Sequence, residues 1–151
     1  MELELNKIYC GDTLSLLKSF PSESIDMCIT SPPYWNLRDY GVDGQIGNEE
    51  NYEEYLSKLK EIFNEVKRVL KTTGSCWVNI GDTYSSHNST GVKKQSLIGI
   101  PDRFKLNMID DGWICRNEII WHKPNAMPSS AKTRFNNDYE KMFFFTKDDL
   151  Y

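Results

Sequence analysis

Apolar and polar residues follow one another along this chain in blocks that predict a succession of helices and strands. The clearest block is residues 52–70, where nine apolar side chains recur at steps of three and four residues and predict one amphipathic helix. Asn51 precedes it as a candidate N-cap, with Glu54 three residues later. Two further helices are predicted: a buried one over residues 12–20, ended by Pro21, and one over residues 100–111.

Short apolar runs predict strands at residues 7–11, 25–30, 75–80, 113–121 and 142–146. The run at 25–30 precedes a Pro-Pro turn and has the composition of a buried strand, whereas residues 35–50 and 82–97 are turn-rich and predict loops. Strands that alternate with helices predict an α/β fold. We expect a mostly parallel sheet, covered by helices on both faces, with a late antiparallel strand pair.

Ligand-binding groups in such sheets gather just past the carboxyl ends of the strands. Two segments have that position here: Gly11-Asp12 after the first predicted strand, and Ser31-Pro32-Pro33-Tyr34 after the second. We therefore expect the functional residues to include these two segments.

Length and charge narrow the class of protein. The 151 residues correspond to one domain, no apolar run is long enough to cross a bilayer, and the acidic N-terminus is unlike a secretory signal, so we expect a cytoplasmic protein. The net charge of −4 is uneven: residues 1–91 hold 8 basic and 14 acidic side chains, and residues 92–151 hold 10 and 8. Any contact with nucleic-acid phosphates is thus expected from the second part.

The cysteines and histidines do not predict a metal site. The four cysteines include no C-x-x-C pair and are expected to be buried free thiols, and the two histidines are isolated. The cysteines are Cys10, Cys28, Cys76 and Cys115.

Ser31-Pro32-Pro33-Tyr34 has the groups needed to methylate an exocyclic amine. The lone pair of such an amine is delocalised into the ring, and two hydrogen-bond acceptors drive the nitrogen toward a tetrahedral, nucleophilic geometry. The Ser31 hydroxyl and the Pro32 carbonyl, fixed by a rigid turn, would be those acceptors, and Tyr34 would stack on a base flipped out of a duplex. Alone, the tetrapeptide is more often only a turn.

The surrounding motifs extend the pattern. The run from Thr30 to Gly41 resembles the catalytic loop of DNA methylases of the N4-cytosine/N6-adenine family, in the permuted class that begins with this loop. Further segments resemble the same family in its order along nearly the whole chain. They are Asn79–Tyr84, Ile100–Arg103, Gly112–Trp121, Lys123–Ser129, Arg134 and Tyr139-Glu140.

The resemblance implies a Rossmann-like, SAM-dependent methyltransferase fold and a site-specific DNA methyltransferase of a restriction-modification system, acting on double-stranded DNA. Serine in the first catalytic position is associated with cytosine N4 in this family, so Ser31 favours that target, with adenine N6 as the alternative. A C5-cytosine mechanism needs a thiolate nucleophile, and no cysteine here follows a proline as that chemistry would suggest.

The resemblance also implies roles for individual residues. Catalysis falls to Ser31, Pro32, Pro33 and Tyr34; binding of S-adenosyl-L-methionine to Cys10, Gly11, Asp12 and Ser31; contacts with the base or the DNA to Tyr34, Trp35, Lys123, Asn125, Ser129 and Arg134. Structural alternatives stand beside several of these roles. Asp12 would cap the helix that it precedes, Trp35 would belong to the core, and Asp82 would shape the active-site wall or act as a cap.

One motif of the family is missing. A glycine-rich turn normally lets the backbone approach the methionine part of SAM, and the nine glycines here include no G-x-G pair. We therefore interpret residues 1–151 as a partial methyltransferase catalytic domain, incomplete at its C-terminus and lacking the target-recognition region. Such a chain is expected to be inactive alone and to need a complementing second half or a homo-oligomer. The alternatives are a non-catalytic DNA-binding or assembly module, and a methylase of RNA or protein amides.

Overall fold

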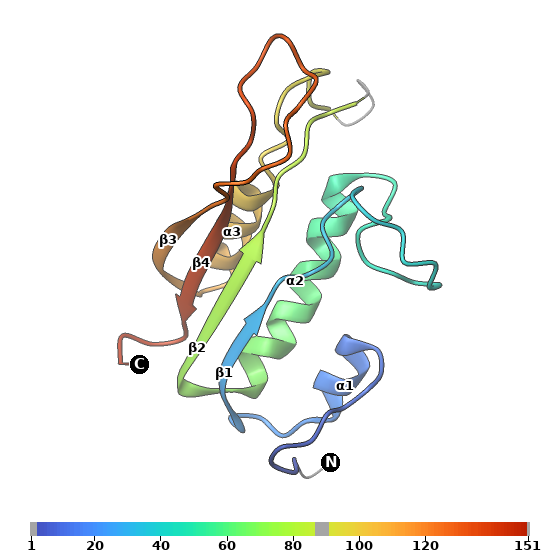
Figure 1. The fold of residues 1–151 in the computed structure, drawn as a ribbon. Helices are drawn as coiled ribbons and strands as arrows, with labels where there is room; N and C mark the ends of the chain where they lie inside the picture. Colours follow the sequence, from blue (N-terminus) through green and yellow to red (C-terminus); the bar gives the residue numbers. More distant parts are fainter. Residues whose placement is uncertain (1–2, 87–90, 151) are drawn as a thin grey trace.

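The fold consists of one mixed four-stranded sheet with three helices on one side of it (Figure 1). The computed structural model describes residues 3–86 and 91–150. The helices are α1 (Thr13–Ser19), α2 (Tyr52–Val69) and α3 (Ile100–Asp110), and the strands are β1 (Ile25–Thr30), β2 (Leu70–Ile80), β3 (Ile114–His122) and β4 (Tyr139–Thr146). Among the described helices, none is long and apolar enough to cross a membrane.

The strands lie in the order β1-β2-β4-β3. β1 runs parallel to β2, with Cys28 opposite Cys76, and β4 is antiparallel to both of its neighbours, β2 and β3. Because β4 alone is reversed, three of the four strands point the same way. The predicted α/β fold and the late antiparallel pair of β3 and β4 are confirmed, and the predicted loop at 35–50 is observed.

Helix boundaries follow the signals in the sequence. Asn51 caps α2 by accepting a hydrogen bond from the backbone N–H of Glu54 at 2.8 Å. Asp12 caps α1 in the same way, accepting from the N–H of Ser15 at 2.9 Å. The seven buried residues of α2 all belong to its predicted apolar stripe.

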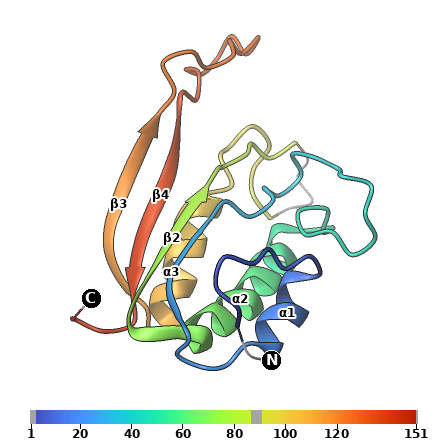
Figure 2. The ribbon, with the colours of Figure 1, turned by 60° about the horizontal axis from the view of Figure 1, so that its bottom comes forward.

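The sheet buries one face against the helices (Figure 2). On this face Val78 of β2 and Phe143 and Phe145 of β4 have no exposed surface. Phe104 of α3 packs edge-on against Phe63 of α2, with ring centroids 5.1 Å apart. These aromatic contacts join the two helices and the central strands into the core.

The opposite face, which we call the open face, has no helix over it within the described residues. Trp77 and Phe144 stack there with ring centroids 4.1 Å apart, while Met27 and Ile29 of β1 are 55% and 65% exposed. The expectations that helices cover both faces and that β1 is buried are therefore wrong for this chain. β1 pairs only with β2 among the described strands, so its other edge is unpaired.

Three further expectations, two on the N-terminal region and one on the cysteines, are corrected. Residues 7–11 form no strand, because no described strand lies beside them, and Ile8 is 94% exposed. α1 has no buried residue, and its main contacts are with α2. Of the four free thiols only Cys76 is buried, and Cys10 is exposed.

Candidate active site

The loop Ser31–Tyr34 leaves the carboxyl end of β1 and is held from α2. Its two prolines lack backbone N–H donors, so the segment cannot continue the hydrogen-bond ladder of the strand. Tyr55 donates its hydroxyl hydrogen to the carbonyl oxygen of Pro33 at 2.8 Å. Burial raises the pKa of Tyr55 well above its usual value, so this phenol remains a donor at neutral pH.

The segment that precedes α2 supports the same loop. The N–H of Asn36 donates to the carbonyl of Gly47 at 2.7 Å, and the indole of Trp35 donates to the carbonyl of Glu49 at 3.0 Å. Gly47 has a φ of +103°, and a Cβ atom there would lie 2.9 Å from the carbonyl oxygen of Tyr34. Glycine is therefore required at this position to keep the catalytic loop in place.

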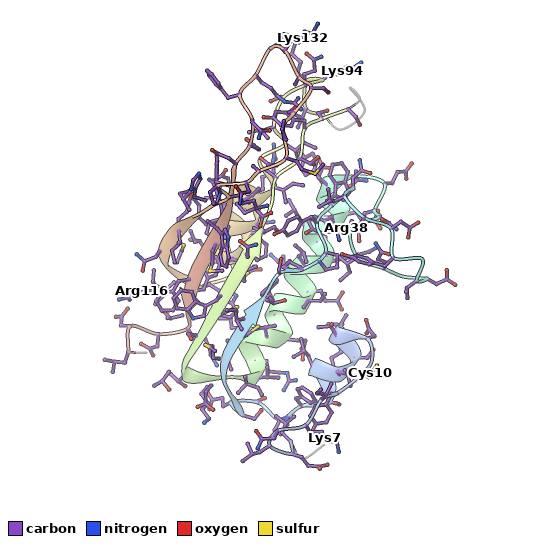
Figure 3. The ribbon with its side chains drawn as sticks, in the orientation of Figure 1. Lys7, Cys10, Arg38, Lys94, Arg116 and Lys132 are labelled. Carbon is purple, nitrogen blue, oxygen red and sulfur yellow. The ribbon has the colours of Figure 1, made fainter. Side chains whose placement is uncertain are left out.

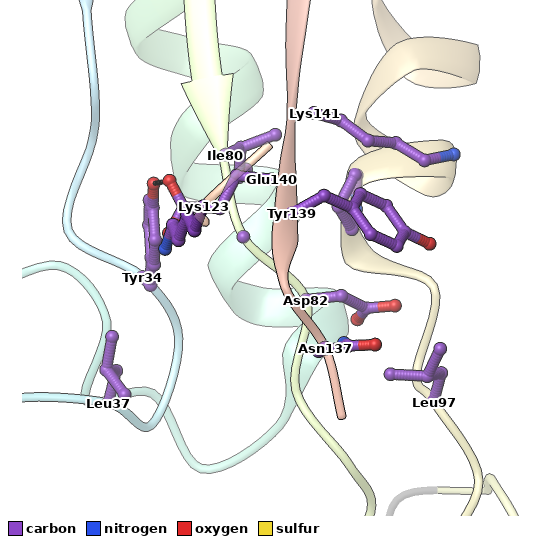
Figure 4. Close-up of a pocket in the computed structure, with 12 residues that line it drawn as sticks. Tyr34, Leu37, Ile80, Asp82, Leu97, Lys123, Asn137, Tyr139, Glu140 and Lys141 are labelled. Carbon is purple, nitrogen blue, oxygen red and sulfur yellow. Dashed lines mark hydrogen bonds and ion pairs between the residues drawn. The ribbon is translucent and has the colours of Figure 1, made fainter. Parts of the chain in front are cut away.

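Polar side chains from three segments, the loop after β1, strand β2 and strand β4, converge on the hydroxyl of Tyr34. This hydroxyl donates to Oε2 of Glu140 at 2.9 Å and accepts from Ser31 Oγ at 3.3 Å and from Asn79 Nδ2 at 2.8 Å. Asn79 also donates to Glu140 Oε2 at 2.7 Å, and Lys123 forms an ion pair with Glu140 Oε1. Figure 4 shows the side chains of Tyr34, Lys123 and Glu140 directed toward one another. We call these five residues the Tyr34 network.

The protonation states of the network follow from its surroundings. Burial, with a contribution from the Glu140 charge, raises the pKa of Tyr34 to about 12. Burial alone would also raise the pKa of Glu140, but hydrogen bonds from Lys123, Asn79 and Tyr34 lower it below its usual value. At neutral pH the network therefore joins a neutral phenol to an ionised carboxylate.

The ring of Tyr34 rests on Gly81, at the end of β2. A Cβ atom at position 81 would lie 2.7 Å from Cε2 and 2.9 Å from Cδ2 of that ring. Any side chain at this position would displace the ring. The backbone of Gly81 and the carboxylate of Glu140 thus fix both the ring and the hydroxyl.

Two cavities meet at Ser31, Pro32 and Pro33. The first, of about 370 Å³, is lined by Ser31–Tyr34 together with Lys123 and Glu140 and is rich in polar groups. The second, of about 220 Å³, is mainly apolar and is lined by Ser31, Pro32 and Pro33 together with Thr13 of α1 and side chains of α2. The loop consequently borders a polar space and an apolar space at once.

The segment Cys10-Gly11-Asp12 is exposed and lies at the start of α1, next to Thr13 in the wall of the apolar cavity. The hydrogen bonds from Ser15 lower the pKa of the Asp12 carboxyl, which is therefore ionised at neutral pH. The helix-cap role of Asp12 is observed. A cofactor role is compatible with it, because the carboxylate has further acceptor positions.

Asp82 has the capping role considered from the sequence, and its role in the active-site wall stays a prediction. Its carboxylate accepts hydrogen bonds from the N–H groups of Gly99 at 3.0 Å and Ile100 at 3.1 Å, and so caps α3 from outside the helix. It also lines a cavity of about 240 Å³ that is shared with Tyr34 and Glu140 (Figure 4).

The remaining sequence-predicted residues separate into two groups. Lys123, at the start of the β3–β4 loop, belongs to the Tyr34 network, whereas Asn125, Ser129 and Arg134 lie farther along this loop, which projects beyond the sheet (Figure 1). The guanidinium of Arg134 lies 3.5 Å from the ring centroid of Tyr84. Figure 3 shows Lys132 near the tip of this loop, so the projecting segment carries two basic side chains, Lys132 and Arg134.

Trp35 is 5% exposed and packs against Tyr52 in the core. Its burial leaves no ring face for a flipped base, and the alternative that Trp35 belongs to the core describes it correctly.

Sequence reasoning assigned no role to Asn79, Gly81 or Glu140. All three fall within segments that resembled family motifs. The available signal was that a hydrogen-bonding side chain occurs at the end of β2 (Asn79) and another at the start of β4 (Glu140).

Among the described residues, no group of three His, Cys, Asp or Glu could hold a metal ion.

Comparisons with known proteins agree with this geometry. Residues 25–151 match the family model for N6/N4 DNA methylases, described as DNA methylase. The chain is 44% identical to the Type II methyltransferase M.Cfr9I of Citrobacter freundii, over 99% of this chain and 57% of that protein. It is 39% identical to M.SmaI of Serratia marcescens, over 96% and 57%. The chain therefore spans little more than half the length of these relatives.

Solved structures show the same fold. The PvuII DNA methyltransferase (cytosine-N4-specific) matches with a TM-score of 0.73 and 29% identity, over 94% of this chain and 49% of that one. A putative DNA modification methylase from Thermus thermophilus, complexed with S-adenosyl-L-methionine, matches with a TM-score of 0.70 and 27% identity, over 93% and 55%. Sequence and structure agree: the chain belongs to the N6/N4 DNA methylase family, whose members are SAM-dependent enzymes.

Proposed function

We propose that this chain provides the catalytic loop of a site-specific, cytoplasmic DNA methyltransferase that methylates N4 of cytosine. The observation that carries the proposal is the position of Ser31, at the junction of two cavities and at the end of the hydrogen bonds that lead to Glu140. Serine at this position and the cytosine-N4 specificity in the name of the PvuII enzyme favour cytosine. Adenine N6 is the alternative target of the same geometry.

The chain's own residues account for activation of the amine. The hydroxyl hydrogen of Ser31 is donated to Tyr34, so the lone pairs of Ser31 Oγ are directed elsewhere and can accept from one amino hydrogen. The carbonyl of Pro33 is occupied by Tyr55, which makes the Pro32 carbonyl the acceptor for the other hydrogen in our proposal. Two preorganised acceptors would favour the nucleophilic form of the nitrogen.

The two cavities suggest how the reactants would meet. Methyl transfer to a nucleophile proceeds in line, so the methyl donor and the amine approach from opposite sides of the transferred carbon. The polar cavity beside Tyr34 is suited to the base, and the apolar cavity beside Thr13 to the cofactor. S-adenosyl-L-methionine would supply the methyl group there, with Asp12 next to Thr13 of the cavity wall.

The residues present fit only part of this cofactor. Asp12 and the Ser31 loop can serve its adenine side and its methyl group, but the nine glycines of the chain include no G-x-G turn for its carboxylate end. We propose that a second segment of protein supplies this turn. The unpaired edge of β1 and the exposed side chains of Met27 and Ile29 support this, because they offer a strand edge and an apolar surface to it.

DNA would approach from the end where the β3–β4 loop projects. This loop carries Lys132, near its tip (Figure 3), and Arg134. Basic side chains on projecting loops contact phosphates and so position a duplex without reading its sequence. The target sequence would be read by parts of the protein beyond this contact surface.

A fusion protein tests the proposal. The 151-residue chain is joined to the part of M.Cfr9I that the match does not cover, expressed in cells, and the cellular DNA is digested to nucleosides for mass spectrometry. We expect N4-methylcytosine from the fusion and much less from its Ser31→Ala variant, whose methyl-transfer rate should fall about 100- to 1,000-fold. N6-methyladenine alone would refute the cytosine assignment. Absence of any methylated base from a folded fusion would refute the function.

A further inference from the structure

The hydrogen bonds of the Tyr34 network have a direction. The hydroxyl of Ser31 donates to Tyr34 Oη at 3.3 Å, and the hydroxyl of Tyr34 donates to Glu140 Oε2 at 2.9 Å. Each hydroxyl thus uses its hydrogen toward the carboxylate. The result is a chain of two hydroxyl groups that begins in the proposed amine site and ends on an ionised acceptor on β4.

Glu140 is held firmly as that acceptor. The register of the sheet places it opposite Trp121 of β3, and its side chain is only 18% exposed. Lys123 binds one carboxylate oxygen, and Asn79 donates to the other at 2.7 Å. Residues far apart in the sequence therefore hold the carboxylate where only Tyr34 separates it from Ser31.

The proposed reaction requires a proton acceptor. As the amine nitrogen bonds to the methyl carbon, the bond between that carbon and sulfur breaks and its electron pair stays on sulfur. The nitrogen then carries a positive charge and must lose one hydrogen as a proton. A protonated exocyclic amine of a nucleobase is a far stronger acid than a carboxylic acid, so transfer to a carboxylate is favourable even when that carboxylate is paired with a lysine.

We propose that Glu140 is the terminal proton acceptor of this reaction and that Ser31 and Tyr34 relay the proton to it. The amine gives its proton to Ser31 Oγ, the Ser31 hydrogen passes to Tyr34 Oη, and the Tyr34 hydrogen passes to Glu140 Oε2. The products are a neutral methylated amine and a protonated Glu140, and both hydroxyl groups are again neutral, with the direction of their hydrogen bonds reversed. This step rests on the proposed function.

Two variants of the fusion protein separate relay from positioning. Glu140→Gln keeps an oxygen that can accept the Tyr34 hydrogen bond but cannot take up a proton, and Tyr34→Phe keeps the ring but removes the link. In single-turnover measurements we expect each to lower the methyl-transfer rate about 100-fold or more, with the double variant no slower than either. The control is Glu118→Gln, which also removes an ion-paired glutamate, bound to Lys105 at 2.6 Å, but one on β3 outside the network.

Chemical rescue supplies a second measurement. Glu140→Ala leaves space beside a cavity of about 370 Å³, and added formate should restore much of the lost rate by accepting the proton in place of the missing carboxylate. A Glu140→Gln enzyme within a few-fold of wild type would overturn the relay and assign the proton to solvent water. Failure of formate to restore any rate in a folded Glu140→Ala enzyme would also count against it. Because the wild-type fusion is assayed alongside for N4-methylcytosine, an unaffected variant refutes only the relay, whereas an inactive wild type refutes the proposed function.

Discussion

On the helix side of the sheet Phe143 and Phe145 have no exposed surface, whereas on the open face Ile29 is 65% and Trp121 is 54% exposed. The strands that carry these residues belong to one sheet, so the difference comes from the layer above each face. α2 and α3 complete the helix side, and Tyr55 of α2 also anchors the catalytic loop through the Pro33 carbonyl. The open face has the apolar composition of an interface. The catalytic loop is therefore anchored from the completed side at Pro33, while Asn79 and Glu140 hold the Tyr34 hydroxyl from the strands, and the proposed second segment belongs on the open face.

The largest effect on stability should come from the completed side. Phe145→Ala removes a fully buried ring and should lower the free energy of unfolding by about 3–5 kcal/mol. The matched change on the open face, Ile29→Ala, removes a largely exposed side chain and should cost less than about 1 kcal/mol. Urea denaturation of the two variants measures both values. Equal losses would show that the two faces are equally covered in solution.

Tyr55→Phe should have the next largest effect. It removes the donor to the Pro33 carbonyl and should lower the free energy of unfolding by about 1–3 kcal/mol, because a partly buried acceptor is left without its partner. Tyr40→Phe, on a residue that is 60% exposed, is the matched control and should be nearly neutral. If Tyr55→Phe were equally neutral, α2 would not anchor the catalytic loop.

The cap of α3 should contribute somewhat less. Asp82→Ala removes the acceptor for the N–H groups of Gly99 and Ile100, and we expect a loss of about 0.5–2 kcal/mol in the free energy of unfolding. Hydrogen exchange should show faster exchange at these two amides before any change in β2. Unchanged protection there would contradict the cap.

The smallest effect concerns pH. The pKa of Glu140 is lowered in the folded protein, so its network stabilises the fold above the ordinary glutamate pKa and this stabilisation is lost as pH falls through the lower, folded-state pKa. Glu140→Gln should therefore flatten the decrease in stability on acidification below about pH 4.5. Thermal unfolding across that range measures the slope for both proteins. An unchanged slope would mean that this carboxylate does not contribute.

Sequence reasoning was most successful where the signal is local. The stripe of α2 and the caps Asn51 and Asp12 depend on residues three or four positions apart, and all three are observed. It failed where neighbours decide the outcome. β1 has the apolar composition of a buried strand, but its burial depends on a second neighbouring strand and a covering layer, and the described residues contain neither.

The active site divides in the same way. Ser31–Tyr34 could be identified because the residues that matter are contiguous. Glu140 could not be assigned a role, because it lies 106 residues from Tyr34 and reaches it only when β4 inserts between β2 and β3. The need for glycine at position 81 is likewise visible only from the ring of Tyr34 that rests against it.

The central claim is that this chain holds the amine side of the active site and depends on a second segment for the cofactor. Titration calorimetry with S-adenosyl-L-methionine, on the 151-residue chain and on its fusion with the remainder of M.Cfr9I, tests it directly, with sedimentation to follow the oligomeric state of each. We expect weak or undetectable binding by the chain alone, self-association through the open face, and stoichiometric binding by a monomeric fusion. Tight stoichiometric binding by a monomer of the 151-residue chain would contradict the account.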